Sequence, residues 1–245
     1  MTTDQIISAS SSVGTFLAAI ATFMTITQIS RQRRASYQPD LAFSRVDFEA
    51  SNDKSSLPLG WKKPKTQDDL RLSLINLGLG AAKNVWLRWS FPIDESVRQI
   101  TQLGKQPPFD APSAFLLDDQ LIINLEHTKI VSNWRDQRSQ YLDYVVPIAS
   151  EQTPRLVRLP EAYMLAVSAI VFFAIKAEKN FLSLLPSLAV DLQFDDIAGS
   201  RHRTALRYDV DISLIKRGAD DFHFLGSLEV NRPDLPRLDS LATGL

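Results

Sequence analysis

Hydrophobic and polar residues alternate with a period of two along much of the chain, which is typical of β-strands with one buried face. The alternating stretches are Leu41 to Phe43, Val46 to Phe48, Leu70 to Leu74, Val85 to Phe91, Leu188 to Phe194 and Leu206 to Ile212. The parity slips once between Phe43 and Val46, as a β-bulge would produce. Because no βαβ units intervene, we predict a mainly β protein whose antiparallel strands pack as an Ig-like β-sandwich.

Two connections between these strands contain typical turn residues. Asp195 to Ser200 predicts a hairpin, with Gly199 in its turn. The run Asn76-Leu77-Gly78-Leu79-Gly80-Ala81-Ala82-Lys83-Asn84 contains G-x-G, but Lys83 stands where a dinucleotide-binding fingerprint requires glycine, and a strand follows instead of a helix. We therefore interpret Asn76, Gly78 and Gly80 as structural turn residues. The glycines would provide positive φ angles and Asn76 would bond the local backbone.

Two segments within the β-rich region have other patterns. Ile93 to Leu103 repeats apolar residues at helical spacing and ends at Gly104, which predicts a short surface helix. The uncharged run from Ala162 to Ile175 is too short to cross a bilayer and favours a buried helix with Pro160 in its first turn. Its β-branched residues leave a buried strand open as the alternative for 160–177.

The N-terminal stretch from Gln5 to Ser30 contains no charged residue. Since about 20 apolar helical residues cross the hydrocarbon of a bilayer, we predict one transmembrane helix over 5–30. A cleaved signal peptide would have basic residues before the apolar run, whereas Arg31, Arg33 and Arg34 follow it. The positive-inside rule then places the N-terminus outside and the main domain in the cytoplasm, at a bacterial inner membrane. The three arginines would contact the membrane surface.

Small and hydroxyl residues form a stripe along this predicted span. Their spacing allows two helices to approach closely and to form interhelical hydrogen bonds. The residues that we predict to mediate association are Ser11, Gly14, Thr15, Ala18 and Thr22. The alternative is that the hydroxyl groups bond carbonyls of their own helix.

The predicted organisation has five parts. They are a short N-terminal tail (1–4), the transmembrane helix (5–30), a basic juxtamembrane linker (31–39), the β-sandwich with one or two inserted helices (40–216) and a loose C-terminal tail (217–245). The last part loses the alternation and contains Pro233 and Pro236, which favours a tail without regular structure.

The pattern Asn-x-Gly-x-Gly-x-Ala-x-Asn-Val from Asn76 and the pattern Leu-x-Val-x-Leu-x-Phe-x-Asp-Ile-x-Gly from Leu188 resemble a loose group of uncharacterised bacterial proteins. That group pairs one N-terminal transmembrane helix with a cytoplasmic β-sandwich. Phe194 stands where the group has a tyrosine. The resemblance covers about two-thirds of the chain and implies an architecture rather than an activity.

Composition narrows the classes of function. The 245 residues include no cysteine and three histidines, and 27 basic residues balance 28 acidic ones. Disulfides, thiolate metal sites and cysteine nucleophiles are therefore excluded, and no basic field attracts nucleic acid. Asp195, Asp196 and His202 could bind a cation, but we favour the interpretation that turn-forming aspartates and a surface histidine explain them without a metal. Since no catalytic or nucleotide-binding motif occurs, we predict no enzyme activity, no cofactor and no metal.

We therefore expect a single-pass membrane protein that forms homo-oligomers through its helix. Its sandwich would bind an unidentified protein partner or sense a signal. The alternative is a membrane-permeabilising effector of toxin or antiphage type, triggered through the sandwich.

Overall fold

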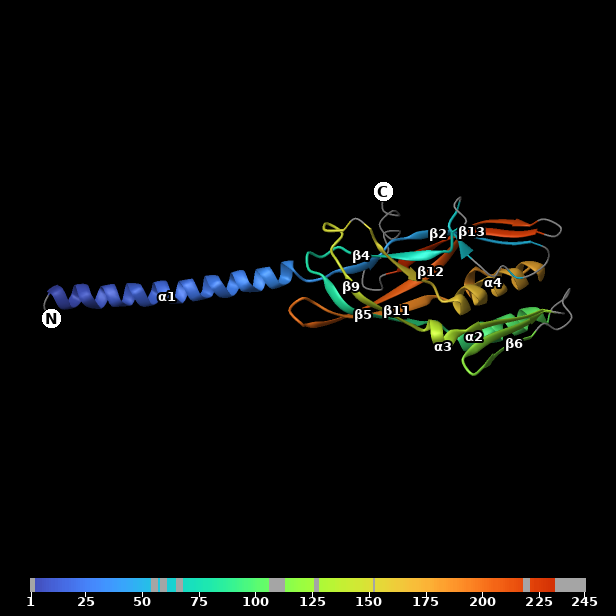
Figure 1. The fold of residues 1–245 in the computed structure, drawn as a ribbon, viewed down its shortest axis with the longest axis horizontal. Helices are drawn as coiled ribbons and strands as arrows, with labels where there is room; N and C mark the ends of the chain where they lie inside the picture. The colour runs from blue at the N-terminus through green and yellow to red at the C-terminus, as the bar shows by residue number, and fades with distance from the viewer. Residues whose placement is uncertain are drawn as a thin grey trace, which may run out of the picture.

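The computed structural model describes residues 3–53, 57, 61–64, 68–105, 113–125, 128–151, 153–217 and 221–231. A long helix, α1 (Thr3–Ser36), projects from a β-rich body that contains the rest of the described chain (Figure 1). The body is built from antiparallel sheets and a few helices, so the predicted mainly β, antiparallel class is confirmed.

Two sheets form the main layers of the body. The larger has the strand order β3-β2-β13-β12-β11-β5-β9 and the smaller the order β1-β4-β10. The strands of the larger sheet are β2 (Val46–Asp53), β3 (Trp61–Lys62), β5 (Ala82–Ser90), β9 (Ser139–Val145), β11 (Leu188–Asp195), β12 (Arg201–Arg217) and β13 (Asp221–Asn231). Those of the smaller sheet are β1 (Leu41–Phe43), β4 (Arg71–Asn76) and β10 (Arg155–Arg158). The ring of Phe43 lies 6.2 Å from that of Trp89 and 5.9 Å from that of Tyr208, so the two sheets pack together.

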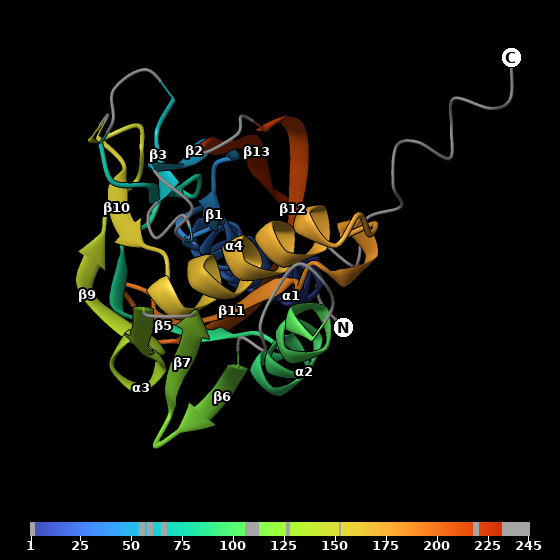
Figure 2. The ribbon, with the colours of Figure 1, turned by 90° about the vertical axis from the view of Figure 1, so that its right-hand side faces the viewer.

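Helix α4 (Glu161–Lys176) lies in the interior of the body (Figure 2). Every residue from Ala162 to Ala174 is buried. The Ser168 hydroxyl accepts a hydrogen bond of 3.0 Å from Nε1 of Trp61, which ties the helix to β3. The segment 160–177 therefore contains a helix rather than a strand. The Pro160 carbonyl accepts its first backbone bond, as expected for a proline at a helix start.

An insertion between β5 and β9 covers α4 on one side (Figure 2). It comprises α2 (Ile93–Gly104), a third sheet and α3 (Trp134–Gln137); the sheet has β6 (Ser113–Leu117), β7 (Gln120–Leu125) and β8 (Thr128–Asn133). The short 3₁₀ helix η1 (Leu182–Leu184) follows α4. The helix predicted over Ile93 to Leu103 is confirmed, but it packs against α4 and buries Ile100 and Leu103.

The alternation identifies the buried face of the strands correctly. In β5, Val85, Leu87 and Trp89 are buried, whereas Trp86 between them is 53% exposed. The predicted hairpin at 195–200 joins β11 to β12 in antiparallel register. The sequence pattern therefore identifies the inner face of the larger sheet.

Two predicted details of the strands are wrong. The change of parity between Phe43 and Val46 is not a bulge, because the chain crosses there from the smaller sheet to the larger one. The segment predicted as a loose tail (217–245) contains β13, which pairs with β12 and β2. Buried Phe224 and Leu228 do alternate in β13, but the intervening Gly226 adds no apolar side chain to the pattern. Residues 232–245 lie outside the described residues.

The predicted transmembrane segment (5–30) is helical, and α1 continues without interruption to Ser36, through the first part of the predicted linker (31–39). However, no helix in the described part of the chain combines the length and apolarity that a membrane crossing requires. The structure therefore does not support the predicted span. Its many serine and threonine residues lower the mean hydropathy of an otherwise apolar helix.

Candidate functional site

Helix α1 is exposed on all sides over residues 14–32, where its side chains are described. Its large apolar side chains are between 58% and 70% exposed at Phe16, Leu17, Phe23, Met24 and Ile26. Because consecutive helical residues are about 100° apart, these residues occupy several directions around the axis. The single chain thus leaves an apolar helix uncovered.

The predicted association stripe lies on this exposed helix. The positions with described side chains are Gly14, Thr15, Ala18 and Thr22, and all are exposed; the side chain of Ser11 lies outside the described residues. A Cβ atom added to Gly14 would meet no atom within 4 Å. The stripe is therefore open to close approach by another helix.

Three threonines of α1 bond carbonyls of their own helix. Thr22 donates to Ala18 and Thr25 to Ala21, each at 2.8 Å, and Thr27 donates to Phe23. This is the local bonding that the sequence leaves open as the alternative to interhelical bonds. It satisfies the hydroxyl donors without water or a second helix, while the hydroxyl oxygens keep capacity to accept.

Asn76 fixes the short segment 37–40 that joins α1 to the body. Its side chain is almost completely buried, with 1% exposed. Oδ1 accepts hydrogen bonds from the backbone N–H groups of Asp40 (3.1 Å) and Gly78 (3.0 Å). Nδ2 donates to the carbonyls of Gly80 (2.7 Å) and Val145 (3.2 Å). The predicted local bonds of Asn76 are present, and two further bonds reach parts of the chain distant in sequence.

Gly78 and Gly80 allow this loop to lie directly on the connecting segment. A Cβ atom on Gly78 would lie 2.1 Å from the carbonyl oxygen of Gln38, and one on Gly80 would lie 1.7 Å from that of Tyr37. Their predicted positive φ is wrong, since Gly199 (φ 83°) is the glycine with positive φ in the described chain. Gly78 and Gly80 are required for close backbone approach instead.

Two further loops reach the same place. Nδ1 of His202 lies 3.3 Å from Nε2 of Gln38, and its Nε2 lies 3.0 Å from Oδ2 of Asp196. This contact with His202 holds the pKa of the Asp196 carboxyl below its ordinary value. The backbone N–H of Ile148 donates to the Asn76 carbonyl at 2.9 Å. The β4–β5, β9–β10 and β11–β12 connections therefore surround the point from which α1 leaves the body (Figure 1).

Asp195, Asp196 and His202 do not converge on one point. Asp195 accepts a hydrogen bond of 3.0 Å from Nδ2 of Asn84, which lowers the pKa of its carboxyl, and it pairs with Arg201. Asn84 has a φ of 51°, where the register of β5 against β11 shifts. In the described chain, no group of three metal-ligating side chains is suited to hold an ion. These residues stabilise the hairpin and its neighbours.

The predicted membrane-surface arginines belong to the last part of α1. Arg31 is exposed, whereas the side chains of Arg33 and Arg34 lie outside the described residues. All three therefore lie between the charge-free part of the helix and the body.

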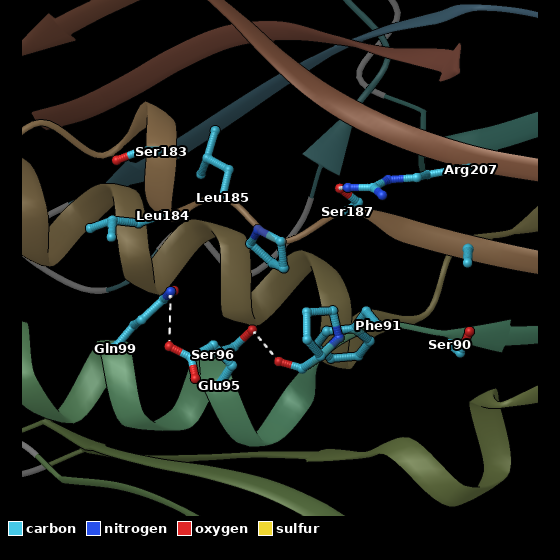
Figure 3. Close-up of a pocket in the computed structure, with 13 residues that line it drawn as sticks. Ser90, Phe91, Glu95, Ser96, Gln99, Ser183, Leu184, Leu185, Ser187 and Arg207 are labelled. Carbon is cyan, nitrogen blue, oxygen red and sulfur yellow. Dashed lines mark hydrogen bonds between the residues drawn. The ribbon is translucent and has the colours of Figure 1, made fainter. Parts of the chain in front are cut away.

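A groove of about 480 Å³ separates α2 from η1 and the start of β11 (Figure 3). Phe91, Leu184 and Pro186 provide apolar walls. Its polar groups bond their neighbours: Gln99 donates to Glu95, and Arg207 donates to Ser187 at 2.6 Å. Because both acidic and basic groups line it, the groove has no dominant ligand chemistry.

An aromatic pair is exposed at one edge of the larger sheet. The ring centroids of Trp86 and Tyr141 are 4.9 Å apart, and both side chains are about half exposed, at 53% and 45%. Tyr141 belongs to β9, the edge strand of the larger sheet. Exposed aromatic residues are typical of protein interfaces. This pair could not be predicted because Tyr141 belongs to β9, a strand that the alternation did not identify.

Comparison with known proteins gives no relative from which a function could be transferred. No protein-family model matches the chain, and neither a curated protein nor a solved structure matches it. The resemblance to the group with one membrane helix and a β-sandwich therefore stays a prediction.

Proposed function

We propose that the protein is a single-pass protein of a bacterial inner membrane, anchored by α1, whose body is an Ig-like module that binds a protein partner. The observation that carries the proposal is the exposure of large apolar side chains all around α1. Helices that are apolar on every side require cover, and soluble monomers rarely leave such a surface in water. Lipid chains can supply that cover along the whole helix.

The polar residues of α1 are compatible with this environment. A polar group in lipid is costly unless it is hydrogen-bonded. Thr22, Thr25 and Thr27 already donate to carbonyls within the helix, so these donors require no water. Placing these three threonines in lipid therefore costs less free energy than their hydropathy values imply.

The charge distribution supports one orientation. Arg31, Arg33 and Arg34 follow the charge-free part of α1 on the side of the body. Positive residues remain on the cytoplasmic side of inner-membrane proteins. We therefore place the body in the cytoplasm and the N-terminus outside.

Two features of the protein support association with other proteins. The stripe that contains Gly14 and Ala18 is open to a second copy of α1, which supports a homo-oligomer. The exposed Trp86 and Tyr141 pair beside the edge strand β9 supports a protein partner of the body.

A charge placed in the middle of α1 tests the anchor. Leu17→Arg should greatly reduce the fraction of the full-length protein that stays with alkaline-washed membranes, because a central arginine costs about 2.5–3.5 kcal/mol on insertion scales. Gln28→Arg, near the basic end of the helix, is the matched control and should remain membrane-bound. Equal behaviour of both variants, or a wild-type protein that washes off, would contradict the proposal.

A further inference from the structure

Four exposed aliphatic side chains lie in the loops that surround the base of α1. They are Leu77 (54% exposed), Leu79 (59%), Ile148 (39%) and Ile197 (50%), and we call them the foot surface. They belong to the β4–β5, β9–β10 and β11–β12 connections, which Figure 1 shows at the end of the body nearest α1. Three segments distant in sequence therefore place aliphatic residues at one end of the molecule.

The position of these loops relative to α1 is fixed by the junction. Helix α1 runs without interruption to Ser36, and the following segment is bonded to Asn76 and His202 through Asp40 and Gln38. The close backbone contacts at Gly78 and Gly80 leave no space between the loop and this segment. The loops must therefore lie at a fixed height above the last residues of the helix.

That height is slightly greater than the thickness of the lipid headgroup layer. The charge-free part of α1 ends at Ser30, and the six helical residues up to Ser36 extend about 9 Å. The headgroup region on each side of the hydrocarbon is about 5–8 Å thick. Since membrane helices are tilted by about 20° on average, loops on one side of α1 come closer to the lipid than its axis does.

We propose that the foot surface rests in the headgroup layer of the membrane that holds α1, so that the body lies against the bilayer. This inference rests on the proposed anchoring of α1. Aliphatic side chains gain free energy on entering the interface between water and hydrocarbon. Lys83 in β5 and Arg201 in β12 lie at strand ends next to two of these connections. Both are exposed and can meet lipid phosphates; the Arg201 side chain is 81% exposed.

The absence of cysteine allows a direct test with single-cysteine variants of the full-length chain. Leu79→Cys and Ile197→Cys would each carry a bimane label, and the protein would be placed in vesicles of phosphatidylcholine and phosphatidylglycerol. Leu117→Cys is the matched control, since this leucine is 54% exposed at the end of β6, a strand of the insertion between β5 and β9 that lies away from the base of α1 (Figure 1). Phe23→Cys reports whether α1 itself is in lipid.

Lipids that carry a quencher in the headgroup should quench the labels at 79 and 197 strongly and the label at 117 little. A lipid with the quencher in its acyl chain should quench the label at 23. If the label at 23 is quenched while those at 79 and 197 behave like the label at 117, the contact of the foot surface with lipid is contradicted, whereas the anchoring of α1 is supported. If the label at 23 is not quenched, both are overturned. Changes at 79 and 197 that follow protein density instead of quencher would indicate contact between copies and would also overturn the lipid contact.

Discussion

Helices α1 and α4 are both rich in apolar residues, yet the protein treats them in opposite ways. From Ala162 to Ala174 every residue of α4 is buried, whereas α1 is exposed throughout its described side chains, 14–32. The sheets and the insertion between β5 and β9 surround α4, while no element of the described body reaches along α1 (Figures 1 and 2). Apolar composition therefore identifies a helix that requires cover, and the fold decides whether the same chain provides it.

The polar residues of the two helices show the same contrast. Ser168 in α4 bonds the indole of Trp61, which belongs to another element. Thr22 and Thr25 in α1 bond the backbone of their own helix. Ser168 of α4 thus contributes to the tertiary structure, whereas Thr22 and Thr25 of α1 bond carbonyls within their own helix.

The largest expected difference in stability is between the same substitution, alanine to aspartate, made in each of the two helices. Ala169 is fully buried in α4, so Ala169→Asp should destabilise the body by about 4 kcal/mol or more because it buries an unpaired carboxylate. Ala21→Asp, in exposed α1, should leave the unfolding transition unchanged. Near-UV circular dichroism during thermal unfolding in detergent measures both. A cooperative wild-type transition in Ala169→Asp would show that α4 is not a core helix.

The junction should contribute nearly as much as a core contact. Asn76→Ala removes four hydrogen bonds from a buried amide and should cost about 3 kcal/mol. Asn84→Gly removes two exposed side-chain bonds while keeping a residue that tolerates positive φ, and should cost at most about 1 kcal/mol. Urea unfolding in detergent gives both free energies. Equal losses would mean that Asn76 does not hold the connecting segment.

A smaller difference in stability is expected when a polar side chain is removed from each of the two helices. Ser168→Ala leaves the indole N–H of Trp61 without its acceptor and should cost about 2 kcal/mol of stability. Thr22→Ala should change the stability of the body by less than about 0.5 kcal/mol. The same unfolding measurement applies. A destabilisation by Thr22→Ala as large as that by Ser168→Ala would show that α1 packs against the body.

The smallest effect concerns the open side of α1. Gly14→Leu should weaken self-association in a bilayer by about 1 kcal/mol, because leucine separates helices that approach at glycine. Phe23→Leu keeps a lipid-compatible side chain and should change little. A membrane dimerisation reporter that carries residues 1–36 compares them. Equal signals from the wild-type helix and Gly14→Leu would mean that the spacing of small residues is incidental.

The strands that could be predicted are those with one wet face. In β11, and in β5 from Val85 onward, every second side chain is buried, so period-two alternation identifies the inner face of the sheet directly. The pattern fails where both faces of a strand are covered. Leu121, Ile122 and Ile123 are all buried in β7, and Leu41, Ala42 and Phe43 are all buried in β1. Because consecutive residues are buried in these strands, alternation reveals neither β7 nor the change of sheet after β1.

The junction could be predicted only in part. The spacing of Asn76, Gly78 and Gly80 correctly indicated a loop with special backbone requirements. The second half of the arrangement lies elsewhere in the sequence, since the partners of this loop are Tyr37, Gln38 and Asp40. A contact across such a separation depends on the completed fold, and no local pattern of residues encodes it.

The hydrogen-bonded junction has a mechanical consequence. Because the backbone of 37–40 is bonded to the body and continues directly into α1, we expect the helix and the body to rotate together. Each residue advances the helix by about 100°, so the orientation of the body sets the direction around the axis of α1 in which Gly14 points. Two bodies docked in a given geometry would select which faces of their helices meet. A rotation of the bodies by about 100°, the angle between consecutive residues, would turn a different face of each helix toward its partner. Such a rotation would transmit torque rather than tension along α1.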